Sequence, residues 1–339
     1  MPSAATWRSS IRRTSAVFSS SAGLVAALVL LAAPAAAQER AVVSGRIVRP
    51  IPGDTVAAPG VRVVLHRIGR VAQGAIDSLR TTADGRFRFG LVRDTTALFL
   101  VSARHGGIEY FSDPITFDST ATPPALTLLV ADTSSTVPVD LAGRYLVIGV
   151  PDPQRSRTAV DLFVLRNAGT VTRVARDSMT PIWRTVLPAG ATSHRIPETG
   201  SELSPQAVQF RGDTMLVFAP LSPGLKQLLV EHRFPAESTR ITVPLGEGAA
   251  QLQVVMEEPA ATVTGAGMRR AESQVIDGRS LARWIGQGGR GEALILSFAG
   301  PDRHETRTVI ALAALMAMAL LAGAWLGLRR RLAGGVTRR

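Results

Sequence analysis

The sequence predicts an all-β protein with two tandem β-sandwich domains between an N-terminal signal peptide and one C-terminal transmembrane helix. Residues 38–308 consist of short alternating apolar and polar runs punctuated by Gly and Pro, and they contain no convincing amphipathic helix. The chain starts with a basic and then apolar segment, and it ends with a long uncharged segment followed by arginines. The segment between them, about 270 residues, is long enough for two domains of ordinary size.

Residues 1–37 have the order of a secretory signal peptide. Three arginines and no acidic residue precede an apolar run at 22–33, which is too short to span a bilayer. The alanines at 35–37 supply the small side chains that a signal peptidase needs, so cleavage is expected before Gln38. An uncleaved anchor is the alternative, and it would give the protein two membrane attachments.

The first domain is expected over residues 38–136. Residues 50–60 are rich in turn formers and predict a loop, whereas along 61–68 the side chains of Val61, Val63 and Leu65 share one face. About seven strands in roughly ninety residues favour a sandwich. The predicted strands are 41–48, 61–68, 75–82, 86–89, 97–104, 108–112 and 125–131.

Residues 75–89 give the clearest local prediction, a β-hairpin. The Asp84-Gly85 dipeptide tolerates the positive φ of a tight turn. In the strand that follows, Phe87 and Phe89 fall on one face and two arginines on the other. We therefore expect strands 75–82 and 86–89 to pair with each other across the turn.

Three segments carry a resemblance to a known family: GRIVRP, then PGVRVVLHR, then TTADGRFRFGL. Their order over residues 41–133 resembles the carboxypeptidase regulatory-like domain. Residues 81–89 are similar to that family's Thr-Asp-x-x-Gly-x-Phe hairpin, with Asp84 displaced from the commonest spacing. The resemblance implies a transthyretin-like β-sandwich, a non-catalytic module found beside peptidase domains and in bacterial envelope proteins. The resemblance implies no catalytic residue in this chain.

A polar joint at 132–136 leads into a second domain, expected over residues 137–259. Its pattern favours an immunoglobulin-like sandwich, with a type II turn at Pro223-Gly224. Residues 260–308 are expected to form one or two hairpins close to the membrane, including a strand at 293–298. The predicted strands of the second domain are 145–150, 158–166, 181–187, 214–219, 225–234, 241–244 and 250–257.

Residues 309–328 predict the transmembrane helix. They contain no charged residue, and at about 1.5 Å per residue a helix of this length covers a hydrocarbon core of roughly 30 Å. The tail at 329–339 is basic and no acidic residue follows Glu305, so the C-terminus is expected in the cytoplasm. The protein is then expected in the cytoplasmic (inner) membrane, with its N-terminal ectodomain outside the cell or in the periplasm. A soluble core helix is the alternative interpretation.

The net charge of +12 does not predict a nucleic-acid partner. Three of the positive charges lie in the signal peptide and five in the tail, so only about four remain outside. Aromatic residues make up 5% of the chain and the arginines are scattered, whereas a nucleic-acid interface clusters basic and stacking side chains. The chain has no cysteine, which leaves packing as the source of stability and excludes attachment through a lipidated N-terminal cysteine.

No pattern typical of metal binding or nucleophilic catalysis is found, so no catalytic, cofactor-binding or metal residue is assigned and no cofactor is expected. His105 and Glu109 are four residues apart, as are His194 and Glu198, but this spacing joins side chains on a helix and not on a strand or turn. No serine has a plausible neighbouring base, and the only lysine is Lys226.

Three further histidines and a glycine motif receive structural interpretations. His66 and His232 are expected at the surface, and His304 at the membrane interface. Residues 286–291 match G-x-G-x-x-G, but a strand and not a helix follows them, so a loop is expected and a nucleotide site is not.

The expected function is that of a non-catalytic binding or assembly module that interacts with other envelope proteins. A tail of eleven residues is too short for a signalling domain, and β-modules present edges and loops to partners. Carbohydrate (glycan) binding is the alternative, although it usually requires a row of exposed Trp and Tyr. The ectodomain has only Trp183, Trp284, Tyr110 and Tyr145. A hydrolase is a third interpretation.

Overall fold

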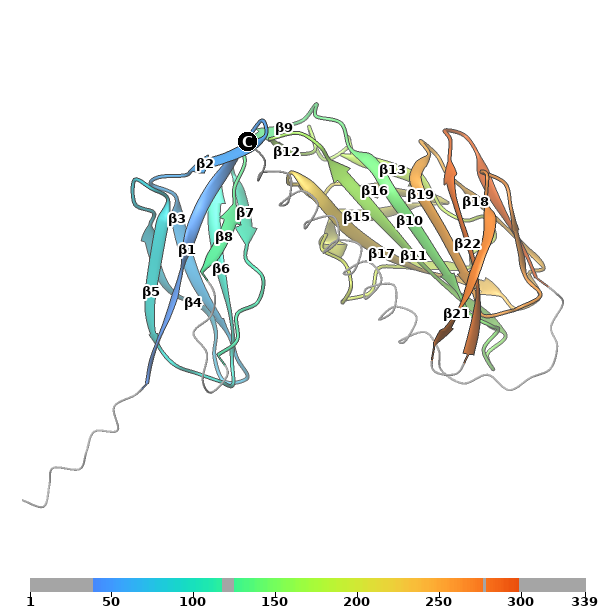
Figure 1. Cartoon of the computed structure of the whole chain (residues 1–339), viewed down its shortest axis with the longest axis horizontal. Helices are drawn as coiled ribbons and strands as arrows, with labels where there is room; N and C mark the ends of the chain where they lie inside the picture. The colour runs from blue at the N-terminus through green and yellow to red at the C-terminus, as the bar shows by residue number, and fades with distance from the viewer. Residues whose placement is uncertain (1–38, 118–124, 277–278, 299–339) are drawn as a thin grey trace, which may run out of the picture.

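The computed structural model describes residues 39–117, 125–276 and 279–298. These residues form strands and turns, with one short 3-10 helix at Pro205–Ala207, so the prediction of an all-β protein is confirmed. The predicted signal peptide at 1–37 and transmembrane segment at 309–328 lie outside the described residues. Among those that are described, no helix is long and apolar enough to cross a membrane. Figure 1 shows two groups of strands, a first unit before the joint and a second unit after it.

Two four-stranded sheets enclose the core of the first unit. Alternate residues of each sheet point into this core, where Phe89, Phe99, Val63 and Leu65 are almost completely buried. One sheet consists of β1 (Arg40–Ile51), β2 (Asp54–Ala57), β5 (Arg86–Val92) and β8 (Leu126–Leu129). The other has the order β4-β3-β6-β7 and consists of β3 (Arg62–Ile68), β4 (Gln73–Arg80), β6 (Leu98–His105) and β7 (Ile108–Phe111).

Strand β1 organises the first sheet because it pairs with three strands. It is antiparallel to β5 along its first half and to β2 along its last residues, and it is parallel to β8. The change of partner occurs at Ile47, whose N–H donates to the Gly85 carbonyl at 2.8 Å and whose carbonyl accepts from the Ala58 N–H at 3.0 Å. A Cβ on Gly85 would lie 2.5 Å from the Ile47 carbonyl oxygen, so only glycine fits at this junction.

The predicted hairpin over residues 75–89 is wrong in its pairing. Strand β4 pairs with β3 and strand β5 pairs with β1, so the turn between them carries the chain from one sheet to the other. The turn and the side-chain faces are confirmed: Gly85 has φ +76°, Phe87 and Phe89 are buried, and the two arginines beside them are exposed. A hairpin and a crossing between sheets share these local signals, and only the packing of the two sheets distinguishes them. Strand β2 lies in the segment predicted as a loop.

Three sheets enclose the core of the second unit. The largest has the order β14-β17-β11-β10-β19-β22-β21 and consists of β10 (Asp140–Ile148), β11 (Ser156–Asn167), β14 (Ser193–Arg195), β17 (Gly224–Pro235), β19 (Ala249–Met256), β21 (Arg269–Ile276) and β22 (Arg279–Gly288). The smaller sheets are β13 (Trp183–Val186), β16 (Thr214–Val217) and β15 (Val208–Arg211), and β18 (Arg240–Pro244), β23 (Ala293–Ser297) and β20 (Thr262–Thr264). Gly224 has the expected positive φ, but it already belongs to β17.

The strands after residue 259 belong to this second core. Strand β22 pairs with β19 and strand β23 pairs with β18, while Trp284 and Leu296 are buried in the core. The expectation of one or two hairpins over 260–308 is confirmed in part for the described residues up to 298: β21 and β22 form an antiparallel hairpin, whereas β23 pairs with β18 and β20 instead of with β22. Their apolar side chains complete the second unit, a long-range pairing that local patterns do not indicate.

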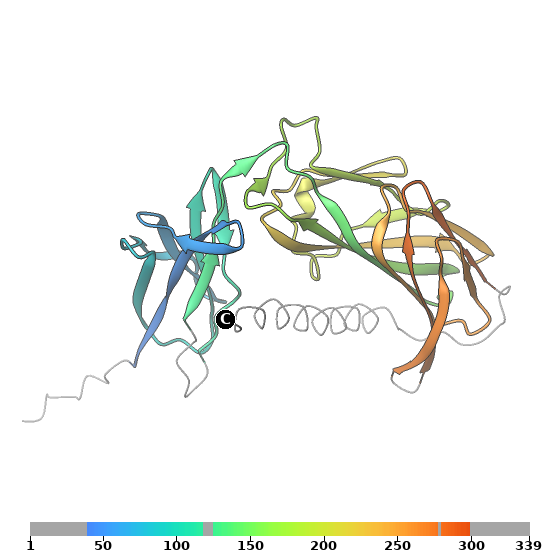
Figure 2. The same ribbon diagram turned by 45° about the horizontal axis from the view of Figure 1, so that its top comes forward.

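The joint between the units is a short parallel pair of strands, visible at the top of Figure 2. Strand β9 (Thr133–Ser134), inside the predicted joint, pairs with β12 (Thr172–Arg173). The Tyr110 hydroxyl donates to the Ala131 carbonyl at 2.8 Å and lies 2.7 Å from Thr172 Oγ1. The end of the first unit is thus hydrogen-bonded directly to the start of the second.

The substitution Gly85→Val tests the junction on β1. Its side chain would meet the Ile47 carbonyl in a backbone conformation with positive φ, so we expect a loss of about 1 to 3 kcal/mol in the free energy of unfolding. The control Arg88→Ala removes an exposed side chain of β5, the strand that follows Gly85, and should change this free energy by within about 0.5 kcal/mol. Denaturant unfolding measures both, and equal midpoints would contradict the assigned role of Gly85.

Candidate functional site

The β4-β3-β6-β7 sheet exposes apolar side chains on the face turned away from the first core. Because strand residues alternate, the residues between the core positions of β3 and β6 point outward. Ile68 and Leu98 lie opposite each other and are each 42% exposed, and Phe111 on β7 is 55% exposed. Neighbouring exposed apolar side chains of this kind mark contact surfaces. We name this surface the outer face; it consists of Val64, His66, Ile68, Leu98, Leu100, Ser102 and Phe111.

Three polar side chains form a hydrogen-bonded chain at the outer face. The Ser102 hydroxyl donates to Glu109 Oε1 at 2.5 Å, and Ser102 Oγ lies 2.9 Å from His66 Nε2. The rings of His66 and Phe111 are 6.1 Å apart. His66 lies on the outward side of β3 as predicted, but it is half-buried by these contacts.

This arrangement is not that of a catalytic serine. In a nucleophilic site the serine donates its proton to the histidine, and a carboxylate orients the histidine. Here the serine proton goes to Glu109, so His66 donates to the serine oxygen, and Ser102 has no exposed surface. Sequence reasoning did not find this contact because the two residues are 36 positions apart and meet only through the pairing of β3 with β6.

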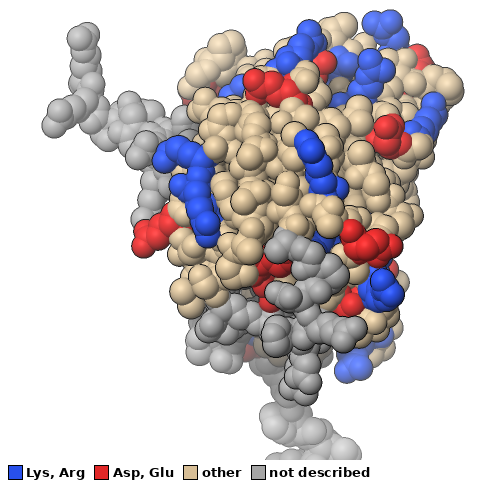
Figure 3. All heavy atoms as spheres, turned by 90° about the vertical axis from the view of Figure 1, so that its right-hand side faces the viewer, with Lys and Arg blue, Asp and Glu red and all other residues tan. Residues whose placement is uncertain are grey.

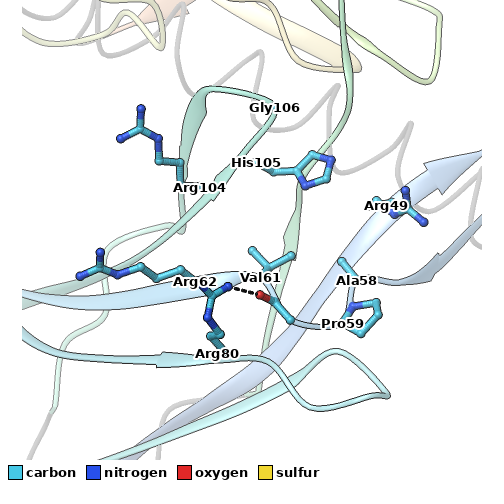
Figure 4. A pocket seen from close by; sticks show the side chains of 10 residues that line it. Arg49, Ala58, Pro59, Val61, Arg62, Arg80, Arg104, His105 and Gly106 are labelled. Atoms are coloured by element: carbon cyan, nitrogen blue, oxygen red, sulfur yellow. Dashed lines mark hydrogen bonds between the residues drawn. The ribbon is translucent and has the colours of Figure 1, made fainter.

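Basic side chains gather where the outer face ends. Arg62 and Arg80 lie opposite each other on β3 and β4, and Arg104 continues the same row on β6. Together with Arg49 and His105 they line a pocket of about 590 Å³, shown in Figure 4. Arginines that are scattered along the sequence are therefore brought together by strand register.

Charges are distributed differently over the side of the second unit that Figure 3 shows. There the basic and acidic side chains are interspersed among uncharged ones wherever the surface is not drawn in grey. A basic stripe of the kind that tracks a nucleic-acid backbone is not seen on that part of the surface.

The second unit contains a buried ion pair. Arg144 is 2% exposed and donates to both carboxylate oxygens of Asp161, at 3.0 Å from Nε and 2.6 Å from Nη2, while its Nη1 donates to the Pro244 carbonyl at 2.6 Å. Burial disfavours the charged form of Asp161, but the Arg144 charge and the hydrogen bonds from His232 and Arg144 outweigh it, so the pKa of Asp161 is lowered. The pair therefore stays charged inside the core.

Two histidines extend this network to the edge of the large sheet. His232 Nε2 lies 3.4 Å from Asp161 Oδ2, and the Nδ1 atoms of His232 and His194 are 2.8 Å apart. His232 is completely buried, so the prediction that it lies at the surface is wrong. Its partner Asp161 is 71 residues away in the sequence, which is why no local pattern revealed the network.

The two His and Glu pairs that are spaced four residues apart make other contacts in the structure. His105 Nε2 lies 2.8 Å from Asp132 Oδ1, whereas Glu109 accepts from Ser102, and His194 meets His232. Within residues 39–117, 125–276 and 279–298, no group of three or more His, Asp or Glu side chains is placed to hold a metal ion. His304 lies outside these residues.

The glycine motif at 286–291 lies partly in a strand. Gly286 and Gly288 are the last residues of β22, and Gly291 lies in the turn before β23. The loop predicted for the whole motif therefore begins only after Gly288. Because no helix follows, the motif lacks the helix N-terminus that a dinucleotide site requires.

Comparison with known proteins assigns no family to this chain. No protein-family model matches it, and no curated protein matches it. Its function therefore has to be inferred from the surfaces described above.

The buried network predicts a specific dependence of stability on pH. Burial, and then the neighbouring His232, lower the pKa of His194 below its ordinary value of 6.5, against the opposing effect of Asp213. The unfolded chain then binds a proton below pH 6.5 that the folded chain binds less readily, so the free energy of unfolding should fall as the pH falls through this range. Unfolding titrations between pH 8 and pH 5, roughly the range over which histidine titrates, should show a smaller pH dependence for His194→Asn than for the natural chain; an equal dependence would contradict the assignment.

Proposed function

We propose that this protein is a non-catalytic binding or assembly module that docks onto another envelope protein through the outer face of its first unit. The observation that carries this proposal is the exposed apolar group of Ile68, Leu98 and Phe111 on one sheet face. A serine, histidine and glutamate do meet there, but their hydrogen bonds run in the direction that does not activate the serine.

The composition of the outer face suits a protein partner. Protein interfaces have an apolar centre and a polar rim, and aromatic residues and arginine are enriched in them relative to the rest of the surface. Here Phe111, Leu98 and Ile68 supply the apolar centre, and the arginines at the end of the outer face supply part of the rim.

The glycan alternative has less support. Stacking of a sugar needs an exposed aromatic ring, but Trp183, Trp284 and Tyr110 are buried in the two cores or at the joint. Tyr145 is half-buried and its hydroxyl donates to Gln251. Phe111 is an exposed aromatic residue, but its cross-strand neighbour is Ser102 and the ring beside it is that of His66, so it is not part of a row of Trp and Tyr rings.

We also assign the first unit to the transthyretin-like sandwiches of the carboxypeptidase regulatory-like family, and the second to immunoglobulin-like sandwiches. Two four-stranded sheets around one core support the first assignment. Antiparallel pairing around a single apolar core supports the second. Both assignments extend the resemblance of residues 41–133 and the strand pattern of the sequence.

The proposal places the module at the cytoplasmic (inner) membrane, held by a single helix at 309–328 with the ectodomain outside. The basic tail supports this orientation. An alkaline phosphatase fused after Thr308 should be active and one fused after Arg339 inactive, because the enzyme matures only on the exported side. The opposite pattern of activities would contradict the orientation.

Partner capture tests the docking proposal. Full-length protein, gently solubilised and crosslinked, should retain one defined envelope protein, and Phe111→Asp should lower the affinity by roughly thirtyfold, since removal of a central aromatic contact typically costs about 2 kcal/mol. Met179→Asp is the matched control, because Met179 is 68% exposed but lies in the second unit. Saturable binding of a defined oligosaccharide on a glycan array, with no protein partner retained, would instead support the glycan alternative.

A further inference from the structure

The arginine-lined pocket at the end of the outer face has the size and charge of a binding site for anions. Its volume of about 590 Å³ falls within the roughly 300 to 1,000 Å³ of ordinary ligand pockets. The charged side chains come from separate strands: Arg49 from β1, Arg62 from β3, Arg80 from β4 and Arg104 from β6 (Figure 4). His105, from the end of β6, completes the lining.

The basic side chains of this pocket outnumber the acidic ones beside it. Arg62 and Arg80 are direct cross-strand neighbours, a placement of like charges that destabilises a sheet, and Arg80 donates to the Gly60 carbonyl. Two carboxylates lie nearby: Glu109 is the cross-strand neighbour of Arg104 and accepts a hydrogen bond from Ser102, and Asp132 pairs with His105. Among the residues that the structure describes, Arg49, Arg62 and Arg104 have no side-chain hydrogen bond or ion pair. An anionic ligand would relieve this repulsion.

The backbone around the pocket indicates which anion fits. Phosphate sites usually offer several free backbone N–H groups. Here the N–H of Gly60 donates to the Thr81 carbonyl, that of Val61 to Thr81 Oγ1 and that of Ala58 to the Ile47 carbonyl. Residue 59 is a proline and has no N–H. Residues 58–61 therefore offer the pocket no free amide, while its arginines offer planar guanidinium groups, which match a carboxylate through two parallel hydrogen bonds.

We propose that this pocket binds carboxylate side chains of an acidic segment in the protein partner, next to the apolar contacts that the outer face makes with the same partner. The proposal rests on the proposed function. It favours a protein over an anionic glycan or lipid because the arginine row and the apolar residues lie on the same strands: Arg62 and Val64 follow each other on one face of β3. A segment with alternating acidic and apolar residues fits both parts.

Binding of a defined acidic peptide tests the pocket. The probe is a fluorescent peptide of alternating Glu and Leu, added to full-length protein in detergent. The double variant Arg62→Gln with Arg104→Gln should bind it at least tenfold more weakly, because hydrogen bonds between guanidinium and carboxylate groups are lost. The matched control is Arg40→Gln with Arg88→Gln, which removes the same charge from exposed positions on β1 and β5 and should change the affinity less than about twofold.

A measurement of thermal stability distinguishes loss of the binding site from unfolding of the pocket variant. Because Arg62 and Arg104 belong to a row of like charges, their replacement should leave the melting temperature unchanged or raise it. The peptide should raise the melting temperature of the natural chain and of the control variant but not that of the pocket variant. Equal weakening of binding in both double variants would show general attraction between charges and overturn the proposal.

Three further probes separate the sources of negative charge. Inorganic phosphate, a uronic-acid oligosaccharide and phosphatidylglycerol vesicles should each compete with the peptide poorly. Stronger binding of any of them than of the peptide, lost in the pocket variant, would overturn the assignment to an acidic protein segment. The captured natural partner then distinguishes the proposed docking function from the proposed pocket. A partner whose binding requires Phe111 but not the pocket arginines would support the docking function and contradict the pocket proposal. Pocket-dependent peptide binding without any captured protein partner would contradict the proposed function, and it would leave a pocket that binds carboxylates but no protein partner to supply them.

Discussion

Burial of sheet faces against one another is the constraint on which this structure depends, because the chain has no cysteine to form a disulfide. The two units bury their sheet faces in different ways. In the first, β1 holds three partner strands and closes two sheets of equal size over Phe89 and Phe99. In the second, a seven-stranded sheet is covered by two small sheets, one of which contains β20 and β23 from beyond residue 259. The second core also encloses Arg144 and Asp161, which is tolerated because each charge is neutralised and hydrogen-bonded by the other.

Local sequence patterns predicted what depends on neighbouring residues and missed what depends on long-range pairing. Alternation correctly placed Val63 with Leu65 and Phe87 with Phe89 on one face of their strands, and in the structure this face is buried in the core. Asp84-Gly85 correctly predicted a turn. The same signals could not tell whether the two strands beside that turn pair with each other, because a crossing between sheets uses the same residues. All-β structure was therefore predictable, whereas sheet membership was not.

The candidate surfaces were not predictable for the same reason. Nothing in the segment around His232 indicates that Asp161 will lie beside it, and the contact of His66 with Ser102 exists only through strand register. The arginine row is the clearest case. Arg62, Arg80 and Arg104 are scattered in the sequence, and they become neighbours because three strands happen to be aligned at those positions.

Strand β7 links the outer face to the joint between the units. Phe111 points outward, while the preceding residue, Tyr110, points inward and its hydroxyl is bonded to Ala131 and Thr172. The residue offered to a partner and the residue that holds the joint are therefore neighbours in one strand. A change at Phe111 acts one residue away from the hydrogen bonds that join the two units, whereas Ile68 and Leu98 lie on β3 and β6, away from those bonds.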